Sequence, residues 1–131
     1  MGGDVESYKT PVGRVQGLGS AKSGFRHWWG QRVTAVALVP LVLWLGFGLA
    51  VYGSADYEAA RAWVAGPVTA VLWIVALAAA LYHAALGLQV VIEDYVDGDG
   101  MKVVAILAAQ AFCILLAVGG IIAVLRIVLG G

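Results

Sequence analysis

The chain has 131 residues, of which 62% are hydrophobic and 12% are charged, and its formal net charge is zero. A soluble domain usually has about 45–50% apolar and about 25% charged residues, so this composition indicates a membrane protein. The balanced charge argues against a nucleic-acid-binding surface, which requires a basic patch. The length leaves room for one compact unit.

Residues 1–26 form a polar, glycine-rich segment that we expect to be extended or disordered when alone and to order against a soluble partner. Five of the eight basic residues precede the first long apolar stretch: Lys9, Arg14, Lys22, Arg26 and Arg32. By the positive-inside rule, the N-terminus is expected in the cytoplasm, and three spans then place the C-terminus on the opposite side of the membrane.

Three stretches contain no charged residue: 33–52, 62–92 and 103–125. A transmembrane helix needs about 20 mostly apolar residues to cross about 30 Å of hydrocarbon, and each stretch is long enough. The sequence therefore predicts an all-α integral membrane protein, with a three-helix transmembrane domain over residues 27–131.

Local signals within this domain refine the prediction. Pro40 predicts a kink in the first helix, and Gly66-Pro67 is typical of the start of the second. Residues 53–66 and 93–102 are expected to be connecting loops. The single cysteine, Cys113, lies in the third stretch and is predicted to be a small core residue.

His83 lies about 24 Å beyond Pro67 at 1.5 Å per residue, near the middle of the bilayer. A polar side chain at this depth must face protein. It can hydrogen-bond to a neighbouring helix, or it can be an axial ligand of haem iron. Small residues share its face of the helix and suit either a porphyrin or a closely packed helix: Ala76, Ala79, Ala80 and Gly87.

The only other histidine, His27, is expected at the membrane edge, too far along the chain to face His83. The second axial ligand of a six-coordinate haem would therefore have to come from another subunit.

The second apolar stretch is followed by the acidic pair Glu93-Asp94 and by Tyr95. Asp94 and Tyr95 suit a solvated loop and an aromatic belt, or they suit a site for a quinone head group. A tyrosine hydroxyl can donate to a quinone carbonyl, and a carboxylate can relay the proton. Arg32 lies at the same edge of the first helix, where its charge would stabilise a reduced quinone or pair with haem propionates.

The pattern His83-x3-Gly87 followed by Asp94-Tyr95 resembles the D-type membrane anchor of succinate dehydrogenase, respiratory complex II. The stretch HWWGQRVTAVALVPL, His27 to Leu41, also resembles that family's entry into its first helix, and the resemblance covers residues 25–131.

The resemblance implies that haem b is held between one histidine of this chain and one of a C-type membrane anchor subunit. His83 corresponds to the ligand, with Gly87 packing at the haem. Arg32 and His27 correspond to residues near the haem propionates. Tyr95 corresponds to a residue that binds ubiquinone, with Asp94 beside it.

The implied function is electron transfer from succinate to ubiquinone. A flavoprotein subunit would oxidise succinate, an iron–sulfur subunit would carry the electrons, and this chain would perform no succinate chemistry itself. Two alternatives stay open at this point. One is the anchor of a quinol:fumarate reductase, and the other is a small three-span transporter or assembly protein with a packing histidine.

Overall fold

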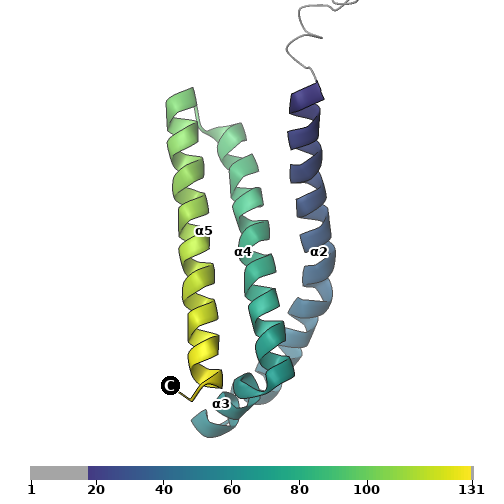
Figure 1. Cartoon of the computed structure of the whole chain (residues 1–131), viewed down its shortest axis with the longest axis vertical. Coiled ribbons are helices and arrows are strands. Elements are labelled where there is room, and N and C mark those ends of the chain that lie inside the picture. The colour runs from purple at the N-terminus through teal and green to yellow at the C-terminus, as the bar shows by residue number, and fades with distance from the viewer. Residues whose placement is uncertain (1–17, 131) are drawn as a thin grey trace, which may run out of the picture.

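The computed structural model describes residues 18–130, with side chains described from Gly24 onward. Over this range it contains four helices: α2 (Leu18–Tyr52), α3 (Tyr57–Ala65), α4 (Pro67–Tyr95) and α5 (Asp99–Val128). The three long helices run side by side, with α4 between α2 and α5, and α3 lies across the end that carries the C-terminus (Figure 1). The predicted all-α fold is confirmed.

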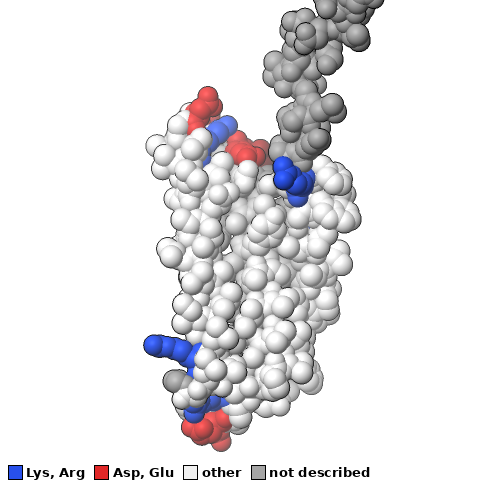
Figure 2. Space-filling model, viewed as in Figure 1, with Lys and Arg blue, Asp and Glu red and all other residues white. Residues whose placement is uncertain are grey.

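Three helices within the described residues are long and apolar enough to cross a membrane: Gly24–Tyr52, Pro67–Tyr95 and Asp99–Val128. Charged side chains gather at both ends of the bundle, and none lies in the band between them on the face shown (Figure 2). Many large apolar side chains are exposed, including Val36 and Leu115. An exposed apolar surface of this extent suits lipid and protein partners, as expected of a transmembrane bundle.

The buried core is small and consists of apolar side chains from α4 and α5: Ala70, Ala76, Leu86, Cys113 and Val124. Small residues let these helices approach closely. For example, a Cβ atom at Gly120 would lie 3.0 Å from Leu77 Cδ1. Cys113 is therefore a core residue, as predicted.

Helix α2 begins at Leu18, before the predicted domain boundary at residue 27. The stretch 18–26 contains Ala21, Lys22 and Arg26, which favour helix, and these outweigh its two glycines. The segment that we expected to be extended or disordered is therefore helical over 18–26, and residues 1–17 lie outside the described part. Helix α2 continues through Pro40 and bends along its length, as a proline within a helix predicts (Figure 1).

Both connections differ from the predicted loops. The first contains α3, whose N-cap Asp56 accepts a hydrogen bond from the Ala59 backbone N–H at 2.8 Å. The second is shorter than predicted, because α4 continues to Tyr95 and α5 begins at Asp99. Gly98 permits this tight connection with a φ of 89°, a conformation that favours glycine.

Aromatic side chains fill the α3 end of the bundle. Trp63 of α3 stacks on Tyr52 of α2 with ring centroids 5.0 Å apart, and it lies 5.9 Å from both Trp44 and Trp73. Gly48 of α2 is buried beneath this cluster, and a Cβ atom there would overlap the Trp63 ring. Aromatic side chains of the chain itself therefore pack this end, where Trp73 Nε1 is buried without a hydrogen-bond partner.

Candidate functional site

His83 joins α4 to α2 through a hydrogen bond. Its Nδ1 lies 3.0 Å from Oγ1 of Thr34, which is on α2. Within the side chains that the structure describes, this is the one hydrogen bond to the ring. The interhelical hydrogen bond considered from the sequence is therefore present. It engages only Nδ1 and leaves Nε2 free to be a ligand.

The His83 ring also lines a shallow surface groove of about 430 Å³. The other lining residues come from α2, and all are apolar: Ala35, Leu38, Val39, Val42 and Leu43. A single nitrogen donor in apolar surroundings, held through its other nitrogen, is the arrangement expected of an imidazole ligand to haem iron. The residues present therefore fit that cofactor.

The small residues near His83 on α4 differ in how far they are exposed. Ala76 is buried in the bundle, whereas Ala80 is exposed. A Cβ atom at Gly87 would meet nothing within 4 Å, so no contact among the described residues requires a glycine there. Glycine in a helix costs about 1 kcal/mol relative to alanine, and Gly46 in α2 is equally open. The space at Gly87 therefore admits a group from outside the chain without requiring one.

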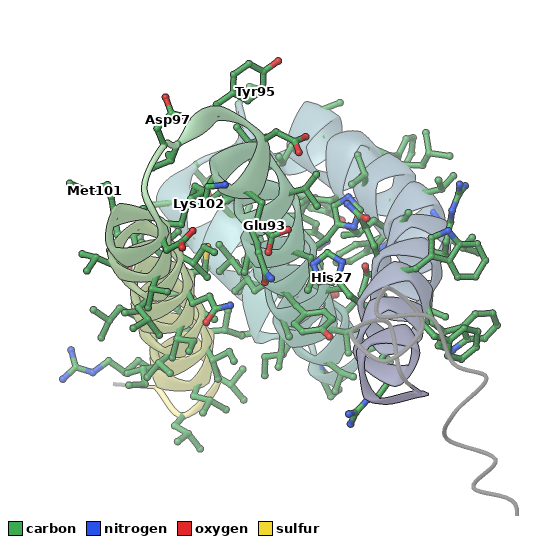
Figure 3. The ribbon with its side chains drawn as sticks, turned by 90° about the horizontal axis from the view of Figure 1, so that it is seen from above. His27, Glu93, Tyr95, Asp97, Met101 and Lys102 are labelled. Carbon is green, nitrogen blue, oxygen red and sulfur yellow. The ribbon has the colours of Figure 1, made fainter. Side chains whose placement is uncertain are left out.

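A second groove, of about 330 Å³, lies between α2 and α4 and is lined by Gly24, His27, Gln89, Val90 and Glu93. His27 Nε2 is buried without a hydrogen-bond partner, while Gln89 Nε2 donates to the Glu93 carboxylate at 2.8 Å. His27 and Glu93 lie on facing sides of the space between the two helices (Figure 3). A buried nitrogen without a partner suits a polar ligand group.

The structure does not bring His27 and His83 together. His27 precedes Thr34 by seven residues on α2, which corresponds to about 10.5 Å along the helix axis. Thr34 contacts the His83 ring, so His27 lies well displaced from it toward the end of the bundle. The two histidines of this chain are thus too far apart to ligate one iron.

Arg32 lies on another face of α2. Its guanidinium carbon is 5.6 Å from the Trp28 ring centroid, a cation–π arrangement. It lines a third groove, of about 390 Å³, with Trp29, Val33, Val36 and Ala37. Arg32 and His83 therefore line different grooves, and the Arg32 side chain is exposed on the outer face of α2.

Asp94 and Tyr95 end α4 as exposed side chains. Tyr95 is 83% exposed, and it points away from the bundle (Figure 3). Twelve residues separate it from His83, about 18 Å along the helix. The structure therefore keeps the predicted quinone-site residues apart from the predicted haem ligand, and within this chain it does not join them to Arg32.

Sequence reasoning missed Thr34, Gln89 and Glu93 as site residues. Thr34 follows Gly30 by four residues and His27 by seven, a spacing that places all three on one face of a helix. Gln89 is a polar residue in an otherwise apolar span, four residues before Glu93. These spacings are the sequence signals that could have indicated the two grooves.

Residues 6–117 match the family described as succinate dehydrogenase/fumarate reductase transmembrane subunit. The chain is 36% identical over 117 residues to the succinate dehydrogenase hydrophobic membrane anchor subunit of Rickettsia bellii, covering 89% of this chain and 94% of that protein. It is 30% identical over 95 residues to the protein of the same name from Paracoccus denitrificans, with 72% and 74% covered. It is 29% identical over 96 residues to the succinate dehydrogenase membrane anchor subunit of Reclinomonas americana, with 71% and 80% covered. With its three apolar spans and this extent of similarity, the chain belongs to the succinate dehydrogenase/fumarate reductase transmembrane subunit family.

Proposed function

We propose that this chain is a membrane anchor subunit of succinate:ubiquinone oxidoreductase that contributes one ligand to haem b and part of the ubiquinone-reduction site. Family membership supports the anchor role. The observation that carries the rest is His83, which is held through Nδ1 by Thr34 in an apolar groove while Nε2 has no partner among the described side chains.

Several residues of this chain would each bind a different part of the cofactor. When bound, haem b supplies a one-electron carrier inside the membrane. His83 would ligate the iron through Nε2, and Gly87 would leave room for the flat ring. His27, whose buried Nε2 lacks a partner, would bind a propionate. Arg32, exposed on the outer face of α2, would neutralise an anionic propionate or reduced quinone.

The second haem ligand would come from a partner subunit. His27, the other histidine of this chain, lies about 10.5 Å along α2 from the residue that contacts His83, too far to ligate the same iron. A C-type membrane anchor would supply the opposing histidine and cover the exposed apolar groove beside His83.

Ubiquinone would be reduced beside Tyr95. The phenol would donate a hydrogen bond to a quinone carbonyl, and Asp94 would share or relay a proton. Because both side chains are exposed at the end of a membrane-spanning helix, they are accessible to a head group that enters from lipid.

The charge distribution supports a cytoplasmic location for this site. Six of the eight lysines and arginines lie before residue 33 or in the first turn of α5, which begins at the same end of the bundle as α2. By the positive-inside rule, the N-terminus and Tyr95 would face the cytoplasm and the C-terminus the periplasm of a bacterial inner membrane. The iron–sulfur and flavoprotein subunits would dock on that cytoplasmic face.

The reverse reaction, quinol:fumarate reduction, is the second candidate, because the family description includes both enzymes. Because the chain belongs to this family of anchor subunits, we no longer propose a small transporter or assembly protein.

The test of this function uses Tyr95→Phe in the assembled complex. Loss of one hydrogen bond is worth about 0.5–1.5 kcal/mol, so ubiquinone reduction should slow by about 2- to 10-fold. Succinate oxidation with a soluble artificial acceptor should be unchanged, since it bypasses the membrane site.

Tyr57→Phe is the matched control, because Tyr57 is also an exposed tyrosine and lies at the opposite end of the bundle. It should leave both activities unchanged. Equal quinone reduction in the Tyr95→Phe and unaltered complexes would show that Tyr95 does not bind quinone.

A further inference from the structure

The Thr34 hydroxyl has three possible hydrogen-bond partners, two on its own helix α2 and one on α4. Its Oγ1 is 2.7 Å from the Gly30 carbonyl oxygen and 3.2 Å from the Gln31 carbonyl oxygen. The same oxygen is 3.0 Å from His83 Nδ1. A hydroxyl has one hydrogen to donate and can accept in addition.

The two carbonyl oxygens can only accept, whereas His83 Nδ1 can donate or accept depending on its tautomer. The Gly30 carbonyl makes the shortest of the three contacts, and we assign the Thr34 hydrogen to it. Threonine in a helix commonly donates to the carbonyl four residues earlier, as here. Thr34 Oγ1 must then accept from His83, which places the ring hydrogen on Nδ1. The Nε2 atom is left with its lone pair, the form that can bind a metal.

We propose that Thr34 is a positioning residue that selects the Nδ1–H tautomer of His83 and aims its Nε2 as a ligand. The ligand role rests on the haem site proposed above. A metal-bound histidine ordinarily donates its other N–H to an acceptor that fixes the ring and increases its basicity. Here the acceptor is a side-chain hydroxyl, itself polarised by the Gly30 carbonyl.

Gly30 sets the distance over which this contact forms. A Cβ atom at Gly30 would lie 3.0 Å from Tyr82 Oη and 3.5 Å from Leu86 Cδ1, so a larger residue would press on α4. The glycine lets α2 approach α4 one turn before Thr34. Gly30 therefore contributes both the close approach and the carbonyl that orients the hydroxyl.

The test compares Thr34→Val with Thr34→Ser in the complex purified from membranes, by haem content, electron paramagnetic resonance and redox titration. Valine has nearly the shape of threonine but cannot accept the His83 hydrogen. Loss of an outer partner of a ligating histidine costs about 10- to 100-fold in affinity. We therefore expect weaker haem retention, altered g values and a higher midpoint potential, because the imidazole donates less charge to the ferric iron.

Serine keeps the hydroxyl and should restore the original spectrum and potential. Thr69→Val is the matched control, since Thr69 is on α4 near Gly66, away from His83. It should have no effect. If valine prevents assembly, Thr34→Ala serves the same comparison, with the same shifts expected.

A Thr34→Val complex with an unchanged spectrum and potential would overturn the positioning role. The same conclusion would follow if serine were as damaging as valine, because packing rather than the hydroxyl would then explain the effect. A His83→Ala complex that keeps the original haem spectrum would overturn the haem site and this role together, so the two failures are distinguishable.

Discussion

The two ends of the bundle are built differently. At the α3 end, four aromatic side chains pack against one another and Asp56 caps the short helix. At the other end, α4 and α5 join through a three-residue connection, Tyr95 projects outward, and His27 Nε2 is buried without a partner. A buried nitrogen without a hydrogen-bond partner occurs at both ends, Trp73 Nε1 at the first and His27 Nε2 at the second. The difference is that aromatic packing fills the first end, whereas His27 lines an open groove at the second.

Two glycines show how the surroundings differ within the bundle. A Cβ atom at Gly48 would overlap the Trp63 ring, so contacts inside the chain require glycine at this position. A Cβ atom at Gly87, one helical turn after His83, would meet nothing within 4 Å. Close packing against Trp63 thus requires a glycine at position 48, whereas the open space at Gly87, beside the proposed haem ligand, leaves room for a group from outside the chain.

The largest effect on stability is expected for Gly48→Ala, which tests whether close packing at the α3 end requires a glycine. In Gly48→Ala the added methyl group forces Trp63 to move, and such overpacking costs about 1–3 kcal/mol. The complex should therefore melt at a lower temperature, as measured by thermal unfolding in detergent. Haem content in the surviving complex should be unchanged, because the aromatic cluster is at the end of the bundle away from Tyr95 and the polar groove.

Gly46→Ala is the matched control for this result. It is in the same helix, and its Cβ atom would meet nothing within 4 Å. We expect no loss of stability there. An equal loss for the two alanine variants would mean that the contact with Trp63 is not what requires a glycine at position 48.

A smaller effect, of the opposite sign, is expected at Gly87. Alanine there removes a helix-propensity cost of about 1 kcal/mol and meets no neighbour within the chain. Stability should be equal or slightly higher, while the b-type absorption spectrum should shift as the methyl group fills space beside the cofactor. A clear loss of melting temperature with an unchanged spectrum would instead assign Gly87 to helix packing.

The three spans could be predicted because the absence of charge over about 20 residues is a local property of the sequence. The same holds for the start of α4 at Gly66-Pro67. Helix α3 was missed because its signals are an Asp56 cap, an acidic first turn and only nine residues, too short to show a clear period.

The site could be predicted only in part, because the sequence does not show which residues of different helices contact one another. His83 stood out as a histidine deep in an apolar span, but its partner Thr34 is 49 residues away and depends on how α2 packs against α4. Ala76 and Ala80 were predicted to suit either a porphyrin or a closely packed helix; Ala76 is buried in the bundle and Ala80 is exposed, because α4 is covered on more than one side. The separation of Arg32 from His83 likewise follows from the rotation of α2 about its axis.

The central claim, that this chain supplies one of two haem ligands from the open side of the bundle, is tested most directly by the low-temperature spectrum of the His83→Ala complex. We predict that the low-spin haem b signal falls or changes its g values and midpoint potential. Assembly with the partner subunits should largely survive, because the His83 side chain makes one interhelical hydrogen bond. A His83→Ala complex with the haem content, spectrum and potential of the unaltered protein would contradict the claim.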